Sequence, residues 1–258
     1  MTDKSLQINR PLPNRPLAGR VTLVTGASRG IGYASAVELA KAGSHIIATG
    51  RTQGGLEDLD DAVRSLAKKE DGIGECTVVP MDFKMLDGID QLGAAVYERW
   101  GRLDGLLANA GVLGEIAPVP HITPKIFDET MAVNVTANFR LIRSFEPLLM
   151  ASPSGRALFV SSRGAQSRNA FWGAYAASKS ALDALVQCWA AETEKTNLRI
   201  NLLNPGPVST KMRAKAMPGE DPDTLPTPKE IAKRIVPLLS PNHKTHGEII
   251  CFRGSANI

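Results

Sequence analysis

The chain has 258 residues, of which 43% are hydrophobic and 22% charged, and its formal net charge is +4. These values are typical of a globular protein with a sizeable buried core. Lys and Arg form no dense block and no apolar run approaches the roughly 18 residues of a membrane helix. We therefore expect a cytoplasmic protein with neither a nucleic-acid nor a membrane partner.

The N-terminal segment, the cysteines and the histidines give no sign of a secretory signal, a disulfide or a metal site. The first nineteen residues are polar and rich in proline, without the apolar region of a secretory signal. We expect residues 1–17 to form a flexible arm and residues 18–258 a single domain. Three distant cysteines are typical of thiols in a reducing compartment, and the four histidines have no metal-ligand spacing, so we expect no metal site.

Short apolar runs alternate with longer amphipathic ones through most of the chain. Such continuous apolar strands, separated by helices, are typical of a parallel sheet covered on both faces. The sequence therefore predicts an α/β doubly wound Rossmann fold with about seven strands. The expected strands span 21–24, 45–49, 77–81, 103–108, 156–161, 199–203 and 248–252; the expected helices span 30–42, 56–69, 87–100, 125–150 (one or two), 174–193 and 228–239.

The segment between Asn204 and Thr227 departs from this alternation. It holds five prolines, too many for one continuous helix. Because it follows the carboxyl end of a strand, it is expected to overhang the ligand crevice of the fold. A substrate lid at about 206–227 is the favoured interpretation, and an ordinary surface loop is the alternative.

A glycine-rich turn joins the first expected strand to the first helix. Residues 25–32 read Thr-Gly-Ala-Ser-Arg-Gly-Ile-Gly, a G-x-x-x-G-x-G spacing rather than G-x-G-x-x-G. Glycines at such a turn let a pyrophosphate approach the backbone, while amides of the following helix point at the anion. The turn, placed between a strand and a helix, predicts a dinucleotide site.

The end of the second strand indicates which dinucleotide is bound. NAD enzymes of this architecture place an acid there for the ribose 2′-hydroxyl, whereas this chain has Arg51, with Arg29 inside the turn. Two guanidinium groups can bind a 2′-phosphate through charge-assisted hydrogen bonds. We therefore predict NADP(H); the alternative is that both arginines are solvated surface residues.

Tyr175 and Lys179 are one helical turn apart, so both side chains project from one face of the same helix. A phenol with a pKa of about 10 is a poor acid-base catalyst near neutrality, and a neighbouring cation favours its ionised form. Such a Tyr can protonate the oxygen formed when a hydride reaches a carbonyl, or remove its proton in the reverse direction. Y-x-x-x-K alone is a weak signal.

Other residues strengthen the signal. Ser162 follows the fifth strand, with Ser161 as a less favoured competitor, and Asn109-Ala110-Gly111 follows the fourth strand. Asn134 lies in the next helix. With Pro205-Gly206 after the sixth strand, this ordered set resembles the short-chain dehydrogenase/reductase family in its compact single-domain form, over roughly residues 18–252.

The resemblance implies a role for each matching residue. Tyr175 is the general acid/base, Lys179 lowers its pKa and bonds the nicotinamide ribose, and Ser162 holds the substrate oxygen. Asn134 fixes a proton-relaying water, unless its role is structural. The implied cofactor contacts are Gly26, Ser28, Arg29, Gly30, Ile31 and Gly32 at the phosphates, Arg51, Asp82 at adenine, Asn109 and Gly111 at the adenosine ribose, Tyr175 and Lys179, and Pro205, Val208 and Thr210 at the carboxamide.

The resemblance also implies that hydride leaves the B face (pro-S) of the nicotinamide. It further implies that the protein forms homodimers or homotetramers through the helix that carries Tyr175. That helix contains Leu182, Leu185, Val186 and Trp189, which can face a partner or pack in the core. Likewise, 171–173 can line a substrate pocket or pack. The tail at 251–254 departs from the acidic sequence that many relatives carry.

The sequence predicts an oxidoreductase acting on a small carbonyl or alcohol with NADP(H). A catalytically silent NADP(H)-binding regulator is the alternative from another class. Sugar-nucleotide chemistry usually needs a larger substrate domain than residues 204–227 can provide. The lid's basic residues can bind an anionic substrate or simply be solvated.

Overall fold

The computed structural model describes residues 15–252. Its centre is one seven-stranded parallel sheet in the order β3-β2-β1-β4-β5-β6-β7, which confirms the predicted doubly wound fold. The strands are β1 Val21–Thr25, β2 His45–Gly50, β3 Cys76–Pro80, β4 Gly105–Ala108, β5 Arg156–Val160, β6 Arg199–Asn204 and β7 Ile249–Cys251.

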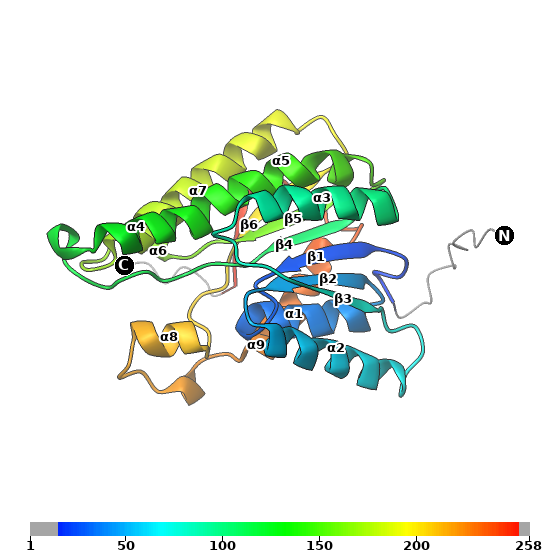
Figure 1. Cartoon of the computed structure of the whole chain (residues 1–258), viewed down its shortest axis with the longest axis horizontal. Coiled ribbons are helices and arrows are strands. Elements are labelled where there is room, and N and C mark those ends of the chain that lie inside the picture. The colour runs from blue at the N-terminus through cyan, green and yellow to red at the C-terminus, as the bar shows by residue number, and fades with distance from the viewer. Residues whose placement is uncertain (1–14, 253–258) are drawn as a thin grey trace.

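Helices cover both faces of the sheet (Figure 1). One layer contains α3 (Asp87–Trp100), α4 (Pro124–Met131), α5 (Ala137–Met150) and α7 (Gly173–Glu192); the other contains α1 (Gly30–Lys41), α2 (Gln53–Ala67) and α9 (Pro228–Ile235). Each layer buries its own apolar cluster against the sheet. Phe145, Phe159 and Trp189 belong to the first cluster and Leu39, Leu56 and Ile235 to the second.

Two of the expected helices are interrupted. The expected helix over 125–150 contains a π-helical turn, Ala132–Thr136, between α4 and α5. The expected helix over 228–239 ends at Ile235 and continues as a 3₁₀ turn, Val236–Leu239. Pro237 explains the second change, because it has no amide hydrogen to continue the α-helical ladder.

The start of the described chain packs against the domain. Leu17 is fully buried, and its amide donates to the carbonyl of Ala42 at 2.9 Å. The Arg15 guanidinium bonds the carboxylate of Glu70 at 2.5 Å. Positions 15–17 of the expected arm are thus held in place, whereas 1–14, like the tail beyond 252, lie outside the described residues. No helix in the described part is both long and apolar enough to cross a membrane.

The sheet order places the chemistry at one edge. β1 pairs with β2 on one side and with β4 on the other, so the chain reverses its winding direction there. In doubly wound folds, ligands bind outside the carboxyl ends of the strands at this switch point. The segments that follow β1, β4, β5 and β6 therefore meet at one crevice.

Candidate active site

The turn after β1 has the conformation that its glycines permit. Gly26 and Gly30 have φ angles of +66° and +60°, in the left-handed region that strains residues with a Cβ. The first turn of α1 contains no acidic residue, and the residue that precedes the helix, Arg29, makes no side-chain capping bond. The amides at this helix start are therefore available to an anion.

Gly32 sits where there is no room for a side chain. A Cβ there would lie 2.3 Å from the carbonyl oxygen of Gly26 and 2.5 Å from Nδ2 of Asn109. The Asn109 amide group in turn donates to the carbonyl of Thr25 at 3.0 Å. The loop after β4 thus clamps the glycine turn, a contact that the sequence did not reveal.

We expect Gly32→Ala to weaken NADPH binding and to cost about 1–3 kcal/mol of stability, because the added methyl forces the turn apart. NADPH fluorescence titration and thermal melting would measure the two effects. Gly54→Ala is the matched control, since a Cβ at Gly54 meets nothing within 4 Å. Equal NADPH affinity in the two variants would contradict the prediction.

Two arginines flank the far end of this turn. Arg29 and Arg51 are both exposed, and neither side chain forms a hydrogen bond or ion pair within residues 15–252. Ser28, which precedes Arg29, packs against Gly50 and Gly55. Asp82, two residues beyond β3, accepts a bond from the amide of Lys84 at 3.0 Å, so its carboxylate is held in the loop.

Tyr175 enters the crevice from the first turn of α7. It is 9% exposed, and its phenol hydrogen-bonds with Ser162. The Ser162 hydroxyl also accepts from the amide of Gly164 at 3.1 Å. A Cβ on Gly164 would lie 3.2 Å from the Tyr175 ring, so this glycine leaves the ring its space. Trp172 packs edge-on against the same ring, with centroids 5.8 Å apart.

Lys179 lies behind the phenol and is 4% exposed. Its ammonium group donates to the carbonyl of Val160, at the end of β5, at 2.8 Å, and lies 6.0 Å from the centre of the Tyr175 ring. Burial lowers the pKa of Lys179 to about 8, while the carboxylate of Asp183 raises it. One ammonium hydrogen is thus used by the protein, which leaves others for a ligand.

The surroundings of the Tyr175 phenol shift its pKa in both directions. The pKa of Tyr175 is raised, chiefly by burial, which disfavours the charged phenolate. The hydrogen bond with Ser162 lowers this pKa, and the carboxylate of Asp183 raises it. Ser162 is therefore a neighbour that favours ionisation of the phenol, and the predicted effect of Lys179 stays a prediction.

Asn134 is fully buried in the π-helical turn. Its amide donates to the carbonyl of Val112 and to the hydroxyl of Ser178, and its oxygen accepts from the Val112 amide at 2.8 Å. These bonds give the side chain a structural role in holding the loop after β4 against α7. A Cβ on Gly111 would lie 3.2 Å from Oδ1 of Asn134, so Gly111 is also packed there. The water that Asn134 is predicted to hold stays a prediction.

The segment after β6 returns to the glycine turn. Val208 is 4% exposed. The Thr210 methyl group lies close to Gly30, since a Cβ placed on Gly30 would be 3.7 Å from it. Thr210 caps α8 (Lys211–Ala216) by accepting from the amide of Arg213 at 3.2 Å. Pro205, Val208 and Thr210 thus follow the strand edge as predicted from the sequence, and α8 projects from the sheet below them (Figure 1).

The ends of the expected lid are joined to each other. The amide of Ser209 donates to the carbonyl of Pro226 at 3.0 Å. Within the segment, Arg213 forms two hydrogen bonds with the carboxylate of Glu220, at 2.5 and 2.7 Å. The segment is therefore a closed loop with its own internal ion pair. Its movement over a substrate stays a prediction.

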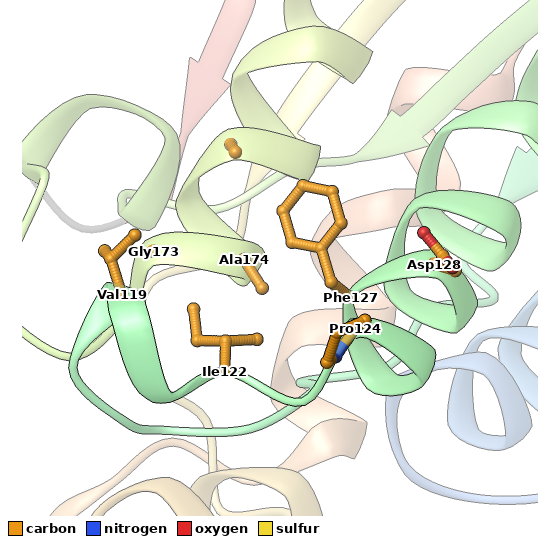
Figure 2. A pocket seen from close by; sticks show the side chains of 8 residues that line it. Val119, Ile122, Pro124, Phe127, Asp128, Gly173 and Ala174 are labelled. Carbon is orange, nitrogen blue, oxygen red and sulfur yellow. The ribbon is translucent and has the colours of Figure 1, made fainter.

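An apolar pocket of about 400 Å³ lies between α4 and α7 (Figure 2). Its lining residues are Val119, Ile122, Pro124, Phe127, Asp128, Gly173, Ala174 and Ala177. Ala177 is exposed, whereas Tyr175 is buried on the other side of the helix, so this pocket is separate from the crevice.

The apolar residues of α7 that were considered for a subunit contact lie mostly in the core. Leu182, Val186 and Trp189 are between 1% and 3% exposed, and Leu185 packs against the same cluster. Core packing is thus the correct interpretation for this set. A partner would contact the opposite side of α7.

Comparisons with known proteins agree with this geometry. The family model for short chain dehydrogenase matches residues 20–221. The uncharacterized oxidoreductase YciK of Escherichia coli K12 is 37% identical over 215 residues, which cover 83% of this chain and 84% of YciK.

Solved structures are similar over nearly the whole chain. A short chain dehydrogenase from Pseudomonas syringae superimposes with a TM-score of 0.87 at 36% identity, covering 93% of this chain and 97% of that one. A short chain dehydrogenase from E. coli CFT073, complexed with NADPH, gives a TM-score of 0.85 at 33% identity, with coverages of 94% and 100%. The family match and these relatives show that the chain belongs to the short chain dehydrogenase family and is an oxidoreductase of that family.

Proposed function

We propose that this protein is an NADP(H)-dependent oxidoreductase that interconverts a carbonyl compound and a secondary alcohol, with Tyr175 as the general acid/base. One observation carries the proposal. The Tyr175 phenol is buried, bonded to Ser162 and backed by Lys179, at the strand edge that also holds the glycine turn. This combination suits proton delivery to an oxygen beside a bound dinucleotide.

The residues around the turn fit the cofactor. Left-handed glycines and uncapped helix amides suit a pyrophosphate. Arg29 and Arg51, which have no side-chain partner among the described residues 15–252, suit a 2′-phosphate. The E. coli CFT073 relative is complexed with NADPH, which supports the same choice here. The proposed cofactor-binding site is completed by Asp82, Asn109, Gly111, Pro205, Val208 and Thr210.

In the reductive direction, bound NADPH supplies the hydride to the carbonyl carbon. Ser162 holds the carbonyl oxygen, and Tyr175 donates its phenolic proton to that oxygen. Lys179 holds the nicotinamide ribose, and Asn134 positions a water through which the proton on Tyr175 is replaced. Oxidation of the alcohol reverses these steps. We propose a small-molecule substrate and a homodimer or homotetramer.

A screen of carbonyl compounds would test the proposal. Purified protein is mixed with NADPH and with aldehydes, ketones, quinones or 3-oxoacyl thioesters, and the loss of NADPH absorbance is followed. We expect turnover of at least one compound and a marked preference for NADPH over NADH. NADPH binding without turnover of any class would favour a silent regulatory protein, and equal efficiency with NADH would contradict the cofactor assignment.

A further inference from the structure

A buried hydrogen bond joins the end of β5 to α7. Ser161 donates its hydroxyl to the carboxylate of Asp183, and the two residues are 3% and 7% exposed. Ser161 directly precedes Ser162, and its amide donates to the carbonyl of Leu203 in β6 at 2.8 Å. Asp183 therefore holds the strand end that presents Ser162 to the crevice.

Asp183 also shares a helix face with the proton-handling pair. Tyr175, Lys179 and Asp183 follow one another at i, i+4 spacing along α7, and all three are buried. The carboxylate raises the pKa of Lys179 and the pKa of Tyr175. Its negative charge thus favours the protonated form of both groups.

Among the described residues, the elements that pack against this part of α7 bring no other negative charge to Lys179. The π-helical turn brings the uncharged Asn134 against α7, and α6 (Gly164–Ser167) has no ionisable side chain. Asp128 of α4 lies at the pocket beside Ala177, on the outer side of α7, and Arg163 is exposed. In β6, Arg199 lies at the opposite end of the strand and bonds the carbonyl of Thr196. Within residues 15–252, we therefore take Asp183 as the main counter-charge of Lys179.

We propose that Asp183 is a positioning residue for proton transfer, which anchors Ser162 through Ser161 and places a negative charge on the buried helix face that carries Lys179 and Tyr175. The inference rests on the proposed acid-base role of Tyr175 and deepens it. A phenol that lost its proton early could not act as the acid in carbonyl reduction. A neutral Lys179 could no longer stabilise the phenolate formed by the transfer.

The charge effect can be measured without turnover. Asp183→Asn keeps the side-chain shape and can still accept from Ser161, but it removes the charge. In protein labelled with ¹³C at the lysine Cε, Lys179 should titrate near its pKa of about 8, apart from surface lysines at about 10.4. The signal is assigned by its loss in Lys179→Arg. We expect Asp183→Asn to lower the Lys179 midpoint by about one pH unit, because an ammonium that loses a nearby anion releases its proton more readily.

Control variants separate charge from structure. Asp183→Glu retains the charge and should keep the midpoint close to the wild-type value, and Asp223→Asn, at an exposed site, should not move it. Asp183→Ser serves as a second neutral variant if circular dichroism shows that Asp183→Asn does not fold. An unchanged midpoint in a folded neutral variant would overturn the role of the charge.

The anchoring effect needs a kinetic readout. Ser161→Ala removes the hydrogen bond but keeps the carboxylate, so we expect a lower kcat for NADPH-dependent reduction of phenanthrenequinone with an unchanged Lys179 midpoint. A kcat equal to wild type would overturn the anchoring role. Wild-type protein that reduces no carbonyl probe contradicts the proposed function instead, and the lysine titration then still tests Asp183 on its own.

Discussion

Tyr175→Phe should lower kcat/KM for carbonyl reduction by roughly 10²- to 10⁴-fold, the contribution usually made by a positioned general acid. The variant keeps the ring that packs against Trp172 and loses only the hydroxyl that bonds Ser162. Its folding and NADPH binding should therefore be close to wild type. Steady-state kinetics with a substrate from the carbonyl screen, together with fluorescence titration of NADPH, would measure both quantities.

Tyr97→Phe is the control for this change. Tyr97 lies on α3 and is 66% exposed, so removal of its hydroxyl should leave kcat/KM unchanged. If Tyr175→Phe retained wild-type activity, another group would have to supply the proton. A loss of activity that merely followed a loss of NADPH binding would also argue against the acid-base role.

The double variant Arg29→Ala/Arg51→Ala should lose NADPH affinity by roughly 10²- to 10⁴-fold while its NADH affinity changes little. Neither guanidinium forms a hydrogen bond or ion pair within residues 15–252, and a hydrogen bond to a charged group is worth about 1.5–3 kcal/mol. Two such contacts to a 2′-phosphate give the stated range, at about 1.4 kcal/mol for each factor of ten. Titration of both cofactors by protein fluorescence would measure the change.

Arg64→Ala removes a positive charge from α2 at a site paired with Asp60 and should leave NADPH affinity unchanged. Arg51→Asp should go further than the alanine change and favour NADH, because an acid can accept from the ribose 2′-hydroxyl and repels the phosphate. Selectivity that stayed the same in Arg51→Asp would refute the assignment of this residue.

The fold followed from patterns that are local in the sequence. Apolar strands, helix periods and the glycine turn predicted the sheet and its helices, since each signal depends on residues close together in the chain. The element boundaries moved by a few residues, as for β4, which begins at Gly105 rather than at residue 103. The π-helical turn at Asn134 was not predicted, because no composition signal marks it.

The sequence predicted which residues form the site, but not the hydrogen bonds and packing contacts between them. Tyr175, Lys179 and Ser162 lie together because the strand ends meet at one edge, a consequence of topology that the sequence pattern already implied. The bond between Ser161 and Asp183, and the space that Gly164 leaves for Tyr175, depend on side-chain packing between β5, α6 and α7. Such contacts join residues 11 to 22 positions apart in the sequence, and no helix or strand periodicity predicts a contact at these separations.

The backbone bond between Ser209 and Pro226 has a consequence for how this scaffold diversifies. Because the two ends of the segment meet at one point, the residues between them can be lengthened, shortened or exchanged without altering the distance that the rest of the chain must bridge. The glycine turn and Tyr175 lie outside this exchangeable cassette. Grafting a relative's segment between positions 211 and 225, which keeps Thr210 beside the glycine turn, would therefore test whether this segment sets the substrate preference while Tyr175 stays unchanged.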